Sequence, residues 1–289
     1  RRKSVTDIAS PVKQRLINRA RADGADVNLY WTRYAVERLL YRLSVSPHVG
    51  DFILKGAMLF VAWSDLLLRP TLDLDLLGHG EDSVERLQRV FREIVAMPVE
   101  ANDGLRFDPD SVRAKPIRDG QEYQGKRLTM RVTLGRIPIA LQVDVGFGDI
   151  ITPGPEGMTF PTLLDQPAPQ LRASTRETAI AEKFHVMVTR GLTNSRLKDY
   201  FDIWVLSRRF AFDRPTLAAA LRATFERRRT ALPEACPIAL ADAYAEQAML
   251  ARAWMGLARR TEAADRSLVE VVRDLTGFIE PVLTEPGED

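Results

Sequence analysis

The spacing of hydrophobic positions changes along the chain. In the first half, amphipathic helical stretches alternate with short apolar or alternating runs that predict strands. From about residue 175 onward, apolar residues recur at the spacing of helices. This order predicts an α+β fold, with a mixed β-sheet domain and flanking helices followed by a C-terminal helical domain.

Local signals set the boundaries of the expected elements. Ser10 and Pro11 suit an N-cap and a first-turn proline, so a helix is expected to begin there and to end near Gly24. Residues 153–169 are rich in proline and are expected to form a linker. Strands are expected near 52–54, 71–77, 127–134 and 137–145, and further helices near 31–44, 57–63, 83–97, 175–190, 198–209, 215–229, 238–260 and 263–283.

The strand expected at 71–77 carries two acids on one face. Asp73 and Asp75 alternate with leucines, and residues two apart on a strand point the same way. Two carboxylates ~4 Å apart repel by about 4 kcal/mol at an effective dielectric near 20. Solvent, an arginine, a shared proton or a divalent cation must offset this repulsion. A solvent-facing strand edge is the alternative to a metal site.

Two neighbouring patterns favour a phosphate and metal site. Lys55, Gly56 and Ala57 form a glycine turn between an expected strand and helix, where backbone N–H groups and a helix N-terminus suit phosphate. Asp144 lies between Val143 and Val145 on a later strand. A lone acid there is costly to bury unless it meets a cation.

This order of motifs resembles the DNA polymerase β-like nucleotidyltransferase superfamily. The resemblance implies that Asp73 and Asp75 hold two magnesium ions. It further implies that Asp144 holds one of them and helps to activate the attacking hydroxyl. The expected fold is therefore a nucleotidyltransferase-like sheet domain.

The second half narrows the resemblance to the AbiEii/AbiGii (MenT-type) toxins. Besides the motifs above, it rests on the helix with Lys183 and on the Arg-x-Lys-Asp-x-x-Asp run from Arg196 to Asp202. The matching pieces span residues 54–202, and Ala57 stands where many members have Gly or Ser. The family consists of nucleotidyltransferase toxins of toxin–antitoxin and abortive-infection systems.

The resemblance also assigns roles. Lys183 would neutralise the triphosphate of the NTP, and Asp202 would orient Lys183 or the nucleotide; a surface lysine and an ion-paired acid are the alternatives. Asp199 and Lys198 are expected to be structural. Lys55, Gly56 and Ala57, with Arg69 and Thr71, would contact the NTP. Tyr200, Phe201 and Trp204 are expected in the core, and His185 is as consistent with packing as with function.

Composition limits the cofactor. The 289 residues include three histidines and one cysteine, Cys236, too few and too scattered for zinc. A metal must then be held by carboxylates, which favours Mg²⁺ or Mn²⁺. The lone cysteine fits a cytoplasmic location, and no apolar run approaches the length of a membrane span.

The net charge of +2 conceals basic segments. Residues 1–22 hold seven Lys or Arg against one acid, and residues 190–229 hold ten against four. Such clusters can contact RNA phosphates, although a solvated helix face explains each equally well. The expected parts are N-terminal helices at 1–50, a nucleotidyltransferase core at 51–170 and a helical domain at 171–289.

The expected activity is transfer of NMP from an NTP to the tRNA 3′ end, which blocks translation, with a cognate antitoxin as partner. One alternative is modification of a protein or a small molecule. Another is a non-catalytic nucleotide-binding or antitoxin-binding module that kept the fold.

Overall fold

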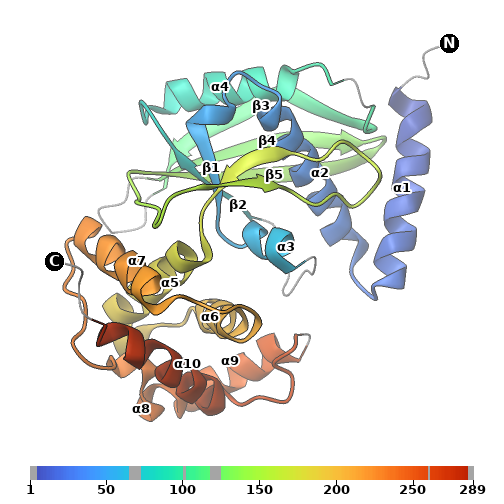
Figure 1. The fold of residues 1–289 in the computed structure, drawn as a ribbon. Coiled ribbons are helices and arrows are strands. Elements are labelled where there is room, and N and C mark those ends of the chain that lie inside the picture. The colour runs from blue at the N-terminus through green and yellow to red at the C-terminus, as the bar shows by residue number, and fades with distance from the viewer. Residues whose placement is uncertain (1–4, 65–72, 100–101, 118–124, 260, 286–289) are drawn as a thin grey trace. The chain divides into compact units, whose positions relative to one another are not determined.

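The structure, a computed structural model, describes residues 5–64, 73–99, 102–117, 125–259 and 261–285. It divides into two compact units (Figure 1). The first comprises Arg1–Gly148 and Glu156–Ala173, and the second comprises Asp149–Pro155 and Ser174–Asp289. Among the described residues, no helix combines the length and apolar character that crossing a bilayer requires.

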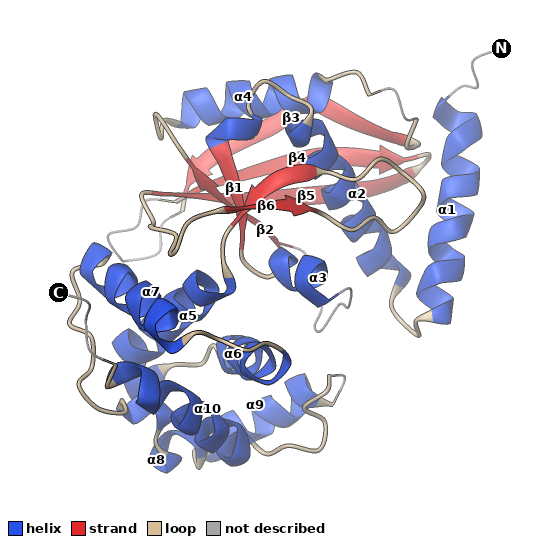
Figure 2. Ribbon diagram, in the orientation of Figure 1, coloured by secondary structure: helices blue, strands red, loops and turns tan. Residues whose placement is uncertain are grey.

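Strands of the first unit form one mixed sheet (Figure 2). β2 pairs in parallel with β5, and β1 pairs in parallel with β7, whereas the other neighbours are antiparallel. The mixed sheet confirms the predicted fold class. In spatial order the strands are β3 (Leu105–Pro116), β4 (Lys126–Leu134), β5 (Ile137–Phe147), β2 (Asp73–Gly78), β1 (Phe52–Lys55), β7 (Gln170–Ala173) and β6 (Glu156–Thr159).

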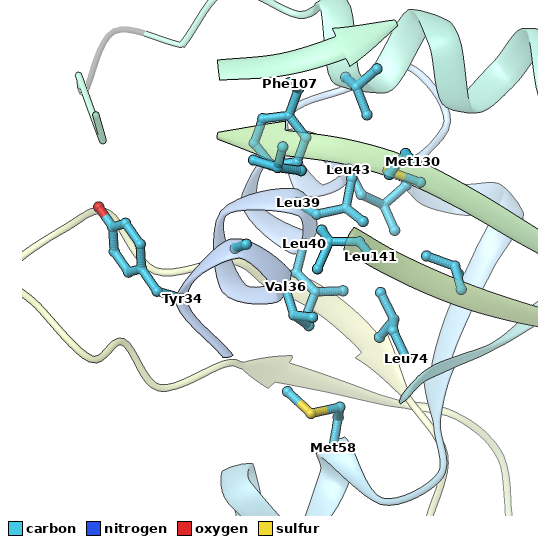
Figure 3. Close-up of a cluster of buried hydrophobic side chains, with 14 of the residues drawn as sticks. Tyr34, Val36, Leu39, Leu40, Leu43, Met58, Leu74, Phe107, Met130 and Leu141 are labelled. Carbon is cyan, nitrogen blue, oxygen red and sulfur yellow. The ribbon is translucent and has the colours of Figure 1, made fainter. Parts of the chain in front are cut away.

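Helices of the first unit bury one face of this sheet. Val36, Leu39, Leu40 and Leu43 of α2 pack toward Leu74 of β2 and toward neighbouring strands (Figure 3). α4 packs beside α2, and its Phe91 ring lies 5.5 Å from that of Phe52 on β1. The helices are α1 (Val5–Ala22), α2 (Val27–Ser44), α3 (Met58–Ser64) and α4 (Val84–Ala96).

A buried charge network fastens α2 to two loops. The Arg42 guanidinium lies 2.7 Å from the carboxylate of Asp103. Glu37 accepts a 2.7 Å hydrogen bond from the backbone N–H of Leu163, and Arg38 donates to the carbonyl of Pro167 at 3.0 Å. Burial raises the pKa of Glu37 to about 7, although the Leu163 N–H and the Arg38 charge act in the opposite direction. A helical pattern of leucines does not reveal these buried charges.

Helices of the second unit pack around an aromatic core. The rings of Tyr200 and Tyr244 stack 4.9 Å apart, and the indole N–H of Trp204 donates to Asp274. Tyr200, Phe201 and Trp204 are buried, which confirms their expected place in the core. The helices are α5 (Arg176–Arg190), α6 (Leu197–Arg209), α7 (Arg214–Arg227), α8 (Asp242–Ala245), α9 (Ala248–Ala258) and α10 (Leu268–Leu283).

The start of the first helix was predicted wrongly. α1 begins by Val5, so Pro11 lies inside it instead of in its first turn. The buried stripe of this helix already includes Ala9, which precedes the proline and continues to Val12 and Leu16. Packing of that stripe therefore outweighs the missing N–H of a proline near the helix start.

The linker and one helix were also predicted wrongly. The proline-rich stretch 153–169 includes β6, and β7 follows at once, because Leu171 and Ala173 are buried where β7 extends the sheet beside β1. The helix expected at 238–260 is broken into a 3-10 turn, α8 and α9. Ala241 and Gln247 have extended backbones and interrupt it.

Candidate active site

A row of charged residues crosses four strands of the first unit. Asp75 of β2 is the register partner of Asp144 on the parallel strand β5. On the outer sides, Lys55 of β1 is paired with Asp75, and Arg127 of β4 is paired with Asp144. Register partners in a sheet point to the same face. The row therefore reads cation, acid, acid, cation, on the face opposite to that covered by α2 and α4.

The third predicted acid lies on the same face. Asp73 precedes Asp75 by two residues, and its register partner is Gln142. The side-chain amide of Gln142 donates to Asp73 at 3.4 Å. Asp73 is exposed, whereas Asp75 and Asp144 are half-buried. The structure thus brings Asp73, Asp75 and Asp144 to one sheet face, with Asp75 and Asp144 as direct neighbours. These three residues are called the acid row below.

The cation beside Asp144 is an arginine. Arg127 binds both carboxylate oxygens of Asp144, from Nε to Oδ1 and from Nη2 to Oδ2, each at 2.8 Å. Bidentate arginine–carboxylate pairs are among the strongest charge-assisted hydrogen bonds. The sequence predicted that Asp144 needs a cation but did not identify Arg127 as that cation. Arg127 could have been found from the register of the hairpin around Gly135, because this register places Arg127 opposite Asp144.

The glycine turn lies directly against the acid row. Gly56 has φ +70°, and a Cβ built there would lie 2.0 Å from Oδ2 of Asp75. Only glycine can adopt this backbone at no steric cost and leave room for the carboxylate. Lys55 ends β1 before the turn, and Ala57 is the last turn residue before α3 begins at Met58. Arg69 and Thr71, expected to touch phosphate, lie outside the described residues.

A second charged cluster lies in the second unit, between α5 and α6. The ammonium of Lys183 is 2.8 Å from Asp202 and 3.1 Å from Asp199. Arg196, just before α6, reaches the other oxygen of Asp199 at 2.6 Å. Asp199 and Asp202 are only 2% and 1% exposed, and Lys183 and Arg196 offset part of the cost of burying these carboxylates.

Protonation in this cluster follows from its partners. Burial alone would raise the pKa of Asp199, but the charges and hydrogen bonds of Lys183 and Arg196 outweigh it and hold the pKa below its usual value. Both partners of Asp199 thus favour its charged form. Lys198, the other residue expected to be structural, is exposed on α6.

His185, two residues after Lys183 on α5, is buried and packs against the end of α7. Its Nδ1 lies 3.3 Å from Arg228 and its Nε2 lies 3.1 Å from the hydroxyl of Thr230. Burial, together with the Arg228 charge, lowers the pKa of His185 to about 4. The imidazole is therefore neutral at pH 7, and both nitrogens are used in holding α5 to the end of α7.

The donor chemistry of the acid row suits a hard cation. Mg²⁺ and Mn²⁺ prefer carboxylate oxygens, and Mg²⁺ commonly takes one or two carboxylates plus substrate phosphates. Within the described residues, no three His, Cys, Asp or Glu side chains approach closely enough to form a metal cluster by themselves. Two adjacent carboxylates, with the glycine turn beside them, have the donor chemistry that Mg²⁺ takes when it binds together with substrate phosphates.

Comparison with known proteins identifies the class of protein. The model of the family described as "Nucleotidyl transferase AbiEii toxin, Type IV TA system" matches residues 38–274, which is more than half of the chain. The chain is therefore a nucleotidyltransferase. It belongs to the AbiEii toxin family of type IV toxin–antitoxin systems.

Two solved structures are similar to the chain. JHP933 from Helicobacter pylori has 14% identity and a TM-score of 0.48, covering 87% of this chain and 90% of its own. Another H. pylori protein, described as a candidate nucleotidyltransferase, has 13% identity and a TM-score of 0.45, covering 86% and 92%. No curated protein matches the sequence.

Proposed function

We propose that the chain is a divalent-metal-dependent toxin that transfers NMP from an NTP to the 3′ end of tRNA and so blocks translation. Asp73, Asp75 and Asp144 hold Mg²⁺ or Mn²⁺ in this proposal. The observation that carries it is the direct pairing of Asp75 with Asp144 across β2 and β5, beside the Gly56 turn. Membership of a nucleotidyltransferase family supplies the reaction class.

Electrostatics support a cation at this position. Adjacent carboxylates ~4 Å apart repel by about 4 kcal/mol at an effective dielectric near 20. A bound metal ion would relieve that repulsion and stabilise the charge that develops on the transferred phosphoryl group. The residues available to hold it are the three acids, whose combined charge Lys55 and Arg127 offset only in part.

Residues near the turn are proposed to bind the nucleotide. Backbone N–H groups at Lys55, Gly56 and Ala57 precede α3, and oriented N–H groups suit phosphate oxygens. Arg69 and Thr71 retain their proposed phosphate contacts on sequence grounds alone. Lys183 is proposed to neutralise the triphosphate, with Asp202 as the residue that orients its ammonium at 2.8 Å.

The acceptor is proposed to be tRNA. The basic segments 1–22 and 190–229 are suited to a phosphate backbone. The toxin–antitoxin family implies an antitoxin as the functional partner. Action on tRNA would take place in the cytoplasm, where translation occurs.

Labelled nucleotides test the acceptor. Each α-labelled NTP is incubated with the protein and Mg²⁺, first with purified tRNA and then with a protein extract. The proposal expects label at the 3′ end of tRNA from at least one NTP. Label found only on protein or on a small molecule would contradict the tRNA assignment. Nucleotide binding by calorimetry without transfer to any acceptor would instead favour a non-catalytic module.

A further inference from the structure

Arg127 occupies the part of Asp144 that a metal ion would need. The guanidinium engages both carboxylate oxygens at 2.8 Å, so neither oxygen is without a strong donor. The guanidinium takes one lone pair on each oxygen and lies on the side from which a metal ion would bind both oxygens, and its positive charge repels a cation there. Arg127 and a divalent ion therefore compete for one side chain.

The Arg127–Asp144 pair also stabilises the protein when no metal ion is bound. Asp144 and Asp75 lie side by side on neighbouring strands, and separating the half-buried carboxylate of Asp144 from the guanidinium that binds both its oxygens is costly. The rigid fork of arginine matches a carboxylate, whereas a lysine ammonium supplies a point charge. The choice of arginine on β4 therefore stabilises the acid row when no metal is bound.

We propose that Arg127 is a latch: it holds Asp144 in the metal-free enzyme and releases it when a divalent cation binds. The proposal rests on the proposed function, because it takes the acid row as the metal site. After release, the Arg127 guanidinium still lies beside the metal site, because β4 is the strand next to Asp144. A phosphate group of the nucleotide is then a suitable new partner for it. Arg127 is thus a positioning residue for the metal and the nucleotide.

The chain offers a matched control on the same strand. Arg131 also lies on β4 and pairs with a carboxylate at 2.8 Å, that of Asp108. It lies four residues from Arg127, about 13 Å along the strand, on the same face. That distance exceeds the Debye length of about 8 Å at physiological ionic strength, so its charge is largely screened from Asp144.

The affinity for Mn²⁺ distinguishes two explanations, release of Asp144 by the Arg127 guanidinium and a general effect of positive charge at position 127. Mn²⁺ is titrated into the wild-type chain and into Arg127→Met, Arg127→Lys and Arg131→Met, and free Mn²⁺ is followed by electron paramagnetic resonance. The latch predicts roughly tenfold tighter binding in Arg127→Met and a smaller gain in Arg127→Lys, which keeps the charge but loses the fork. Arg131→Met should bind as the wild type does.

Thermal unfolding in EDTA is the second readout. The latch predicts a lower midpoint for Arg127→Met than for Arg131→Met, and a larger rise of that midpoint on adding Mn²⁺. If Arg127→Met does not fold in EDTA, Arg127→Lys carries the comparison. Equal affinity in Arg127→Lys and the wild type, or no gain in Arg127→Met, would overturn the latch and leave the proposed metal site intact. Absence of Mn²⁺ binding in all four proteins would overturn both.

Discussion

At the scale of single residues, Gly56 and Asp75 depend on one another. Gly56 has a left-handed backbone, with φ +70°, and a Cβ at this position would collide with the carboxylate of Asp75. A side chain at position 56 has to strain the turn and also displace the acid. This contact links the glycine turn to the acid row, which neither motif reveals by itself.

The variant Gly56→Ala tests this contact. We expect a loss of activity of about 100-fold, because small misplacements of a catalytic group have effects of that size, together with about 1–2 kcal/mol of lost stability from the left-handed backbone. Gly24→Ala is the matched control: its φ is +61°, but nothing lies within 4 Å of the added Cβ. It should lose stability and keep its activity. Equal activity losses in both variants would contradict the account.

His185 gives the second unit a dependence on pH. Its pKa of about 4 in the folded chain lies below the ordinary value of 6.5. Between these two pH values the imidazole binds more protons in the unfolded chain than in the folded chain. The contribution of His185 to the free energy of unfolding is therefore full above pH 6.5 and is lost as the pH falls toward 4. Urea unfolding at pH 7 and pH 4.5 should show about 2 kcal/mol less acid destabilisation in His185→Gln than in the wild type. A steeper loss in the variant would refute this.

At the scale of elements, the α5–α6 contact combines stability with the proposed nucleotide site. Lys183→Ala removes the ammonium that lies 2.8 Å from Asp202 and 3.1 Å from Asp199, both of which are buried. We expect about 3–5 kcal/mol of lost stability from the broken buried pair. We also expect about 2–4 kcal/mol of lost transition-state stabilisation, by analogy with other lost charge contacts.

A double variant separates the two effects. Lys183→Ala with Asp202→Asn removes one buried charge of each sign, so it should recover much of the stability measured by thermal unfolding. Transfer activity should remain lost, because the ammonium is still missing. Recovery of activity along with stability would show that Lys183 acts only as a structural ion-pair partner.

Local spacing in the sequence predicts which side chains share a face of one element, whereas the pairing of distant strands cannot be predicted from it. The spacing of Asp73 and Asp75 fixes a shared strand face, and the spacing of Asp199 and Asp202 fixes a shared helix face. Arg127 needed one more step, the hairpin register, which follows once the turn at Gly135 is known. The adjacency of β2 and β5 joins segments about 70 residues apart and is decided by packing of the whole sheet.

At the scale of the whole molecule, element order was sufficient for the fold class. The β6–β7 hairpin escaped prediction because its strands are four residues long and prolines lie between them. The buried charges Glu37, Arg38 and Asp103 escaped it because burial of a charge depends on partners distant in sequence. The proposed division into residues 1–50, 51–170 and 171–289 stays a prediction.

Basic surface residues are expected to bind the acceptor. Arg190 and Arg214 are exposed in the segment 190–229, and Arg252 is an exposed arginine outside it. Replacing Arg190 or Arg214 with alanine should raise the KM for tRNA. It should also reduce the slope of log binding constant against log salt by about one per lost phosphate contact. Arg252→Ala should change neither, and a uniform effect of all three would contradict a localised RNA surface.

The most direct test of the paired acids is magnesium-dependent transfer of labelled nucleotide by Asp75→Asn, with Asp108→Asn as the control. Asp108 is a strand aspartate that pairs with Arg131, away from the acid row. We expect Asp75→Asn to stay folded, because it removes one of two neighbouring like charges, and to lose both transfer and metal binding. Asp108→Asn should transfer nucleotide at the wild-type rate. Transfer at the wild-type rate by Asp75→Asn would show that the paired acids do not hold a catalytic metal ion.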